Sequence, residues 1–490
     1  MLTQEDFINI EKQASAIYEN LELEIIEEIA TRIVRVGYAN TVVLNNIQIA
    51  QEMGVLYQDI ITLVAKYNNS SYEKVAEIFE QAGAKTLDRD DFIYKEAGLN
   101  PVSIKQSRPI MQTMSATIEK TAGNLQNLVM TTAIATQTQF YNAMNMAYME
   151  VSTGVKSYSQ SILDAIDNIS SQGAVITYPS GRKMSLESAV RMNIVTGVNQ
   201  TCGKLQELRA DEVGCDLMEL TAHSGARPSH AHWQGKIVSR SGKKGYLSLK
   251  DIGYGEVTGF KGVNCRHDWY PYYKGSPKTY TKEQLKAWEN EKVTYNGKEY
   301  SKYDATQIQR RLERQIRADK KELAGLQGIL KSNTTDNKLI EDTKSQFSKQ
   351  SLIYKTHQNE LDNFIQQTSL RKDNTRLYVG KQDKEIGTQV GNVTKIANKY
   401  NNSDITGSKV NGVTITEIGE HVISRTYARN VNFEDVQDAL KNPVGYGKIR
   451  TDKSQQIKGL NCTVVINTET GKLITVYPKK TKKGQENENK

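Results

Sequence analysis

The sequence predicts a mainly α-helical chain with a loop-rich unit near its middle, a charged helical stalk after it and a small α+β domain at the C-terminal end. Apolar residues recur at three- and four-residue steps in the N-terminal half, which is the period of an amphipathic helix. Four of the six histidines and two of the three tryptophans lie between residues 223 and 273, which indicates one specifically built unit. Short β-like segments separated by turn residues close the chain.

Composition favours a water-soluble chain of two or three domains, because 490 residues exceed what one core usually holds. The 64 Lys and Arg residues outnumber the 56 Asp and Glu residues, which gives a net charge of +8. This mildly basic balance is compatible with a nucleic-acid partner but does not require one. We expect no membrane span and no signal peptide, since no long apolar run is present and the first residues are acidic. Four cysteines do not make a disulfide framework, so we expect reduced thiols.

The N-terminal region is predicted to be helical. Residues 3–38 read as one long helix, with Thr3 as the N-cap and Asp6 in the first turn. Further helices are expected over 44–52, 56–67, 72–81 and 103–169, and from Ser185 to about residue 208. A small hairpin is expected over 175–184 around Pro179-Ser180-Gly181, and a strand over 217–222.

Residues 281–374 are predicted to form a charged helical stalk or linker. A short helix over 281–290 and an Asn-Gly hairpin over 294–300 come first. Two long, highly charged helices over 304–330 and 338–367 then carry only a sparse apolar stripe with a roughly heptad step. Such a narrow seam is typical of a helical hairpin or coiled coil.

The central stretch gathers potential metal ligands. The candidates are Cys202, Cys215, His223, His230, His232, Cys265 and His267. Some four of them could bind a structural zinc ion, which prefers thiolate and imidazole ligands. The alternative is that these side chains only pack and form hydrogen bonds in a rigid loop network. Hydrolytic zinc chemistry would also need a carboxylate base, and neither Glu219 nor Asp268 is marked for that role.

The C-terminal segment carries a second candidate site. His421, Arg425 and Arg429 are four residues apart, so on a helix at about 100° per residue they share one face. Four short strands are expected after this helix and a second one, over 448–451, 455–458, 462–467 and 472–477. A histidine beside two arginines can cleave RNA without a metal, since the 2′-hydroxyl is the nucleophile and the arginines bind the phosphate. Thr475 and Tyr477 could add hydroxyl donors, whereas the alternative is a solvated helix face.

The central motifs resemble a known family. The segments TCGK at 201–204, HSGARPSHAHWQGK at 223–236 and GFKGVNCRHDWYPYYKG at 259–275 are similar to the phage minor capsid protein 2 family of tailed phages and prophages. This resemblance implies that residues 1–280 form a structural head domain that contacts portal and capsid proteins. It also implies a location in the virion, after synthesis in the bacterial host cytoplasm.

The C-terminal segment resembles a second group. The pattern H-x3-R-x3-R followed by CTVVINTETGKLITVYP is similar to phage nuclease domains of the barnase, EndoU, colicin and RelE group. The resemblance implies a ribonuclease-like domain over 375–483. It implies the catalytic residues His421, Arg425, Arg429, Thr475 and Tyr477, an RNA substrate, no required cofactor and a cognate immunity protein. The polar, charged composition of the last residues predicts a disordered tail at 484–490.

Three hypotheses follow from these patterns. The first is a structural head protein that carries a ribonuclease effector at its C-terminal end. The second is a purely structural protein whose last domain is inactive or binds nucleic acid. The third is a zinc-dependent hydrolase at the central cluster, which would need metal at a solvent-open position.

Overall fold

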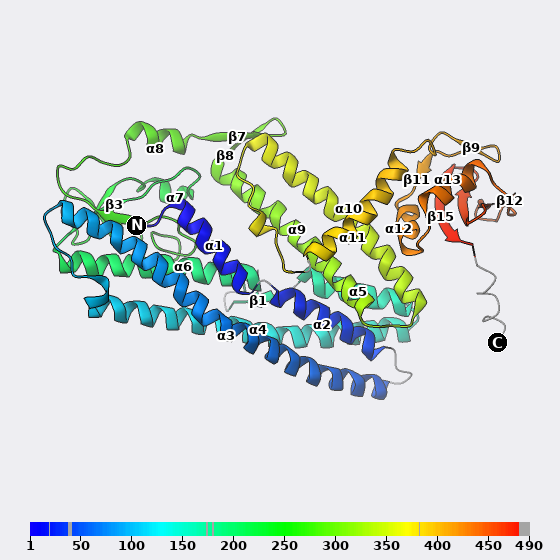
Figure 1. Cartoon of the computed structure of the whole chain (residues 1–490), viewed down its shortest axis with the longest axis horizontal. Helices are drawn as coiled ribbons and strands as arrows, with labels where there is room; N and C mark the ends of the chain where they lie inside the picture. Colours follow the sequence, from blue (N-terminus) through cyan, green and yellow to red (C-terminus); the bar gives the residue numbers. More distant parts are fainter. Residues whose placement is uncertain (19, 38–41, 173–174, 179–180, 382, 480–490) are drawn as a thin grey trace.

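The computed structural model describes residues 1–18, 20–37, 42–172, 175–178, 181–381 and 383–479 of an elongated, mostly helical molecule (Figure 1). Its N-terminal part is a bundle of long helices. These are α1 (Gln4–Ile17), α2 (Leu21–Val36), α3 (Val42–Glu96), α4 (Arg108–Ser152), α5 (Tyr158–Gln172) and α6 (Leu186–Glu212), with a short 3-10 turn, η1 (Ile104–Gln106), before α4. The predicted capping box at Thr3 and Asp6 is confirmed.

The lengths of these helices differ from the prediction. The expected helix over 3–38 is two helices, α1 and α2, because α1 packs on α6 whereas α2 packs on α3 and α9. The three short helices expected over 44–81 are wrong, since α3 runs unbroken for 55 residues. Its apolar face lies on α4 and α6, and this packing outweighs the weak helix propensity of the Asn and Ser residues inside it. The helix expected over 103–169 ends at Ser152 and restarts as α5.

The loop-rich unit predicted near the middle of the sequence lies at one end of the helical bundle, over residues 213–273 (Figure 1). A four-stranded sheet of order β5-β4-β3-β6 and the short helix α7 form its regular structure. Their bounds are β3 (Leu217–Leu220), α7 (Pro228–Ala231), β4 (Ile237–Ser239), β5 (Leu247–Ser248) and β6 (Trp269–Pro271). We call residues 213–273 the His/Cys module; buried aromatic residues, Trp233, Phe260 and Trp269 among them, fill its core. The expected hairpin is present as β1 (Val175–Thr177) and β2 (Lys183–Ser185), with Pro179 and Ser180 outside the described residues.

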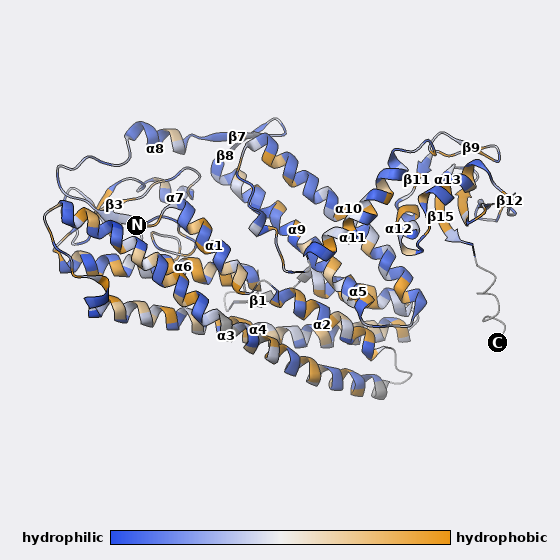
Figure 2. Ribbon diagram, in the orientation of Figure 1, coloured by the Kyte–Doolittle hydropathy of each residue, from blue (hydrophilic) through white to orange (hydrophobic). Residues whose placement is uncertain are grey.

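The predicted stalk is wrong, because its two long helices belong to the body. Here α8 (Lys282–Glu289) and the hairpin β7 (Lys292–Tyr295) and β8 (Lys298–Ser301) lead into α9 (Lys302–Lys331) and α10 (Asn337–Thr368). Hydrophobic residues are sparse in α9 and α10 (Figure 2), yet the two helices share one core with α1–α6. Helix α9 lies on α2 and α5, where Gly325 and Gly328 allow close approach.

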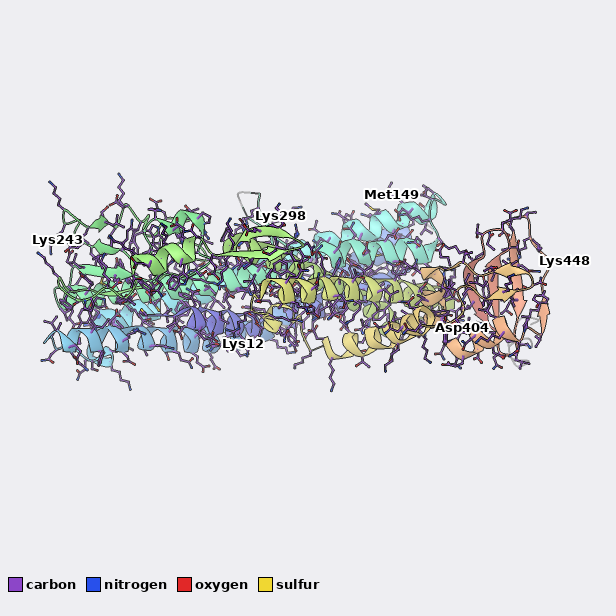
Figure 3. The ribbon with its side chains drawn as sticks, turned by 90° about the horizontal axis from the view of Figure 1, so that it is seen from above. Lys12, Met149, Lys243, Lys298, Asp404 and Lys448 are labelled. Carbon is purple, nitrogen blue, oxygen red and sulfur yellow. The ribbon has the colours of Figure 1, made fainter. Side chains whose placement is uncertain are left out.

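The C-terminal unit is a small α+β structure with a core of its own. After the 3-10 turn η2 (Asn374–Arg376), its elements are α11 (Asp383–Asn401), β9 (Lys409–Val410), β10 (Val413–Thr414), β11 (Glu417–Ile418), α12 (Glu420–Ala428), α13 (Phe433–Lys441), β12 (Gly445–Tyr446), β13 (Ser454–Lys458), β14 (Cys462–Asn467) and β15 (Lys472–Pro478). It lies at the opposite end of the long axis from Lys243, as the view from above shows with Asp404 and Lys448 labelled (Figure 3).

The sheet of this unit differs from the predicted four antiparallel strands. It has five strands in the order β11-β15-β14-β13-β12, and β11 runs parallel to β15. No strand forms over 448–451; β12 pairs with β13 a few residues earlier instead. The predicted tail at 484–490 lies outside the described residues. In the part of the chain that the structure describes, no helix is long and apolar enough to cross a membrane.

Candidate functional site

The His/Cys module brings three of the seven predicted ligands together. His230 lies on α7, and Cys265 and His267 lie in the loop that leads into β6. One nitrogen or sulfur atom of each residue lies within 4.8 Å of the other two. All three residues are buried, with exposed fractions of 2%, 1% and 1% in that order.

Hydrogen bonds fix which nitrogen of each imidazole carries a proton. His230 Nε2 donates to the backbone carbonyl of Thr258 at 2.8 Å, because a carbonyl oxygen only accepts. His267 Nε2 lies 2.9 Å from Oε1 of Gln234, and that oxygen also accepts the backbone N–H of His223. Both Nε2 atoms are therefore donors, and in a neutral ring each Nδ1 then carries a lone pair.

The lone pairs of His230 Nδ1 and His267 Nδ1 face each other, and the cluster offers a hydrogen-bond donor for only one of them. His230 Nδ1 and His267 Nδ1 are 3.3 Å apart, and Cys265 Sγ lies 3.7 Å from His267 Nδ1. A single thiol proton can satisfy only one of these acceptors. Burial lowers the pKa of His230 to about 4 and, with the neighbouring imidazoles, lowers the pKa of His267 well below its ordinary value. At neutral pH the pocket is thus a cluster of acceptors around a common point.

The other four predicted ligands lie outside this cluster of three. His223 stacks on His267 with ring centroids 4.5 Å apart, while its Nδ1 lies 3.0 Å from the Ser224 carbonyl. His232 is exposed. Cys202 is buried on α6, where burial raises its pKa to about 11, and the Cys215 thiol donates to the Leu217 carbonyl.

The geometry does not favour a hydrolytic centre here. Asp268 accepts hydrogen bonds from Lys261 and from the backbone N–H of Leu2, and Glu219 accepts the backbone N–H of Thr279. Both carboxylates are therefore engaged elsewhere. Because the three clustered residues are almost fully buried, a metal at this place would have no route for substrate, so the arrangement suits a structural ion.

The second candidate site lies where the C-terminal unit meets α10. Arg429, at the end of α12, reaches β15, where its guanidinium lies 3.3 Å from Thr475 Oγ1, donates to the Val476 carbonyl and stacks 4.0 Å from the centre of the Tyr477 ring. Arg425 lies one turn earlier on the same face. Four of the five residues predicted to be catalytic are thus close together.

Acidic residues of α10 pair with both arginines. Arg425 forms ion pairs with Glu341 at 2.5 Å and Asp342 at 3.2 Å, and Arg429 pairs with Glu341 at 3.0 Å. The sequence analysis did not identify these two acids, which lie more than 80 residues earlier in the chain. An acidic pair in the first turns of a charged helix carries no local signal of a distant partner.

His421 lies one further turn back on α12. Burial, together with the charges of Arg425, Lys349 and Arg429, lowers its pKa, so the imidazole is neutral at pH 7 and able to accept a proton. The positions expected for a proton acceptor and for phosphate-binding arginines are present on one helix. In this conformation, however, both guanidinium groups already hold carboxylates.

Comparison with known proteins identifies the helical body. The sequence model of the family described as phage minor capsid protein 2 matches residues 2–372. A structural protein of Lactococcus phage LL-H is 26% identical over 281 residues, which is 54% of this chain and 73% of that protein. A structural protein of Lactococcus phage mv4 is 35% identical over 72 residues, which is 15% of this chain and 50% of that protein.

No solved structure matches the chain. The family match covers the His/Cys module and continues through α9 and α10, so it extends past the predicted domain boundary at 280 and stops before the C-terminal unit. It confirms the resemblance inferred from the central motifs. The chain belongs to the phage minor capsid protein 2 family.

Proposed function

We propose that this protein is a structural component of the head of a tailed phage or prophage and contacts the portal and capsid proteins. The family match over residues 2–372 carries the proposal, because this stretch contains both the helical bundle with its large core and the His/Cys module. Both similar phage proteins are named structural proteins, which supports the same role. In this reading the chain is made in the bacterial host cytoplasm and built into the head during assembly.

The test separates heads from tails. Particles of the phage that encodes the chain are disassembled, heads and tails are purified, and the chain is quantified in each by mass spectrometry. Cross-linking of intact heads then identifies the neighbours. We expect the chain in the head fraction with cross-links from the exposed faces of α3 and α4 to portal or capsid subunits. Its absence from heads, or cross-links to tail proteins only, would contradict the proposal.

A ribonuclease activity of the C-terminal unit is a second proposal, favoured by the cluster of Arg425, Arg429, Thr475 and Tyr477 with His421 on the same helix. In it, His421 takes the proton of the RNA 2′-hydroxyl as that oxygen attacks the phosphorus, and the arginines stabilise the charged phosphate. The bond from phosphorus to the 5′-oxygen breaks, and this oxygen takes a proton from the protonated His421 or from water. RNA would have to displace Glu341 and Asp342. The effector would therefore be inactive while docked, and a cognate immunity protein would bind the released unit.

This second proposal has its own experiment. The full chain and a Glu341→Gln/Asp342→Asn variant are incubated with labelled RNA in EDTA. Because Glu341 and Asp342 no longer hold the arginines in this variant, we expect it to cleave the RNA and to leave 2′,3′-cyclic ends. Adding His421→Ala to the variant should abolish this cleavage. If the released variant leaves RNA intact between pH 5 and 8, the ribonuclease proposal fails. The C-terminal unit is then a docked accessory domain, and the structural proposal is unaffected.

A further inference from the structure

We propose that His230, Cys265 and His267 bind one zinc ion, which holds the loops of the His/Cys module together. This inference is independent of the proposed activity of the C-terminal unit. It also reduces the seven candidate ligands to three whose ligand atoms already converge, with His223 as the candidate for the fourth position. Three observations carry it: the spacing of the ligand atoms, the hydrogen bonds behind them, and the architecture that they would bridge.

The spacing of the ligand atoms fits tetrahedral zinc. With zinc–nitrogen bonds of about 2.05 Å and a zinc–sulfur bond of about 2.3 Å, tetrahedral angles place two nitrogens about 3.3 Å apart and a nitrogen and a sulfur about 3.6 Å apart. The two Nδ1 atoms are 3.3 Å apart, and Cys265 Sγ is 3.7 Å from His267 Nδ1. Two edges of the coordination polyhedron are thus already formed, and the third lies within 4.8 Å.

The hydrogen bonds behind the imidazoles are those of metal-binding histidines. Such residues donate the second ring N–H to a carbonyl or carboxylate, which fixes the ring and leaves the other nitrogen free to bind metal. Thr258 supplies a backbone carbonyl to His230, and Gln234 supplies an amide oxygen to His267. The backbone N–H of His223 fixes the orientation of the Gln234 amide. Without an ion, two buried lone pairs 3.3 Å apart would be left facing each other.

The architecture of the module also fits a bridging ion. Its strands are two to four residues long, and its loops carry most of the chain between them. An ion at the cluster would join α7 to the loop before β6, and through Thr258 it would fix the Gly-rich loop between them. A closed zinc site supplies folding free energy to such loop-rich units.

His223 is placed to complete the coordination. Its ring stacks on His267, and its Nδ1 faces the Ser224 carbonyl, so the lone pair lies on Nε2. Because His223 lies outside the group of three whose ligand atoms converge, its side chain would have to rotate to bring this nitrogen to the fourth position that zinc prefers. The resulting ligand set is three imidazoles and one thiolate, all from the module.

The experiment measures metal in the full chain. The protein is purified without chelator, and bound metals are quantified by inductively coupled plasma mass spectrometry. We expect about one zinc per chain, and loss of nearly all of it in Cys265→Ser and His267→Asn variants. Cys202→Ser is the matched control, since this buried cysteine lies outside the cluster; it should keep its zinc.

Two further measurements do not depend on whether ligand variants fold. Chelation of the wild-type chain should lower its melting temperature by several degrees, and added zinc should restore it. Gln234→Leu should lower zinc affinity about 10- to 100-fold, as loss of a supporting hydrogen bond does at other metal sites. A folded wild-type chain that holds no zinc, takes none up and melts at the same temperature with or without it would overturn the proposal.

Discussion

The interior of the family-matched body and its junction with the C-terminal unit use the same kind of ion pair in different surroundings. In the body, Lys261 and Asp268 pair with side chains only 2% and 0% exposed. At the junction, Arg425 and Arg429 share Glu341, whose side chain is 32% exposed. Loss of one partner inside the body leaves a charge that water cannot reach, whereas loss of one partner at the junction leaves a charge that is partly in contact with solvent. Together with the separate core of the C-terminal unit, this difference indicates that the unit is docked on the body.

The largest effect is expected from Asp268→Asn, which removes the negative charge beside the buried Lys261 ammonium and leaves it only neutral amide oxygens as partners. Breaking a buried pair from one side costs about 3–5 kcal/mol of unfolding free energy. Urea denaturation followed by circular dichroism measures the loss. The control is Lys292→Ala, whose partner Glu299 is 65% exposed and whose loss should cost under about 1 kcal/mol.

The Lys261–Asp268 ion pair also predicts how the free energy of unfolding changes with pH in the acid range. Burial alone would raise the pKa of Asp268, but the charges of Lys261 and of the N-terminal ammonium lower it below its ordinary value. The carboxylate therefore contributes fully above the ordinary aspartate range and loses its contribution as the pH falls through the lowered pKa. The stability difference between wild type and Asp268→Asn should shrink only in acid. An equal difference at all pH values would contradict the ion-pair explanation.

A smaller and local effect is expected from Arg429→Ala at the junction. The change removes bonds to Glu341 and to the Val476 carbonyl, and hydrogen bonds of charged groups contribute about 1.5–3 kcal/mol each. Hydrogen exchange should speed up in the C-terminal unit while the exchange of α1–α6 stays unchanged. Lys448→Ala, on the exposed far end, is the control and should change neither region. Equal acceleration throughout the chain would show that the unit is not docked but integral.

Gly328→Ala distinguishes a packed α9 from a free stalk by the sign of its effect. An added Cβ would lie 2.7 Å from Ala30 Cβ and 3.2 Å from the Glu27 backbone, so we expect a loss of about 1–3 kcal/mol. On a solvated stalk the same change would stabilise the helix by up to about 1 kcal/mol. Gly387→Ala on α11 is the control, because an added Cβ there would meet no atom within 4 Å outside its own stretch of helix, so this change should raise the melting temperature. If Gly328→Ala stabilised the protein, the prediction that α9 is part of a free stalk would stand again.

The stalk shows what periodicity cannot predict. The sparse apolar stripe of α9 has the heptad step of a coiled coil, and the sequence predicted the helix itself correctly. Its partner, however, is not another charged helix alone but α2 and α5, with Gly325 and Gly328 as contact points. As long as the helix that packs against it is unknown, a glycine in a charged helix indicates only a lowered helix propensity.

The two candidate sites show the same limit. The metal-binding chemistry of histidine and cysteine indicated a candidate site in the central stretch. The four-residue spacing predicted that Arg425 and Arg429 share one helix face, as they do on α12. Which three of the seven candidate ligands converge depends on loop conformation, which the sequence patterns do not predict. The partners that decide each site, Gln234 behind His267 and Glu341 beside the arginines, are ordinary polar residues without a motif. Sequence analysis therefore found candidate side chains that the structure brings close together, but not their hydrogen-bond and ion-pair partners.

The smallest expected effect is the coupling between Arg425 and Asp342, which a double-mutant cycle of Arg425→Ala and Asp342→Ala measures by urea denaturation. The two side chains are 14% and 16% exposed and 3.2 Å apart, and Asp342 also pairs with Lys338, so we expect about 0.5–1 kcal/mol. Because the screening length falls to about 3 Å in 1 M salt, most of this coupling should disappear there. The matched cycle on Lys321 and Glu22, each 9% exposed, should keep more of its coupling in salt because solvent ions reach it less. If the junction pair resisted salt as well as the interior pair, the two surroundings would be equivalent, and the C-terminal unit would have to be regarded as part of the body.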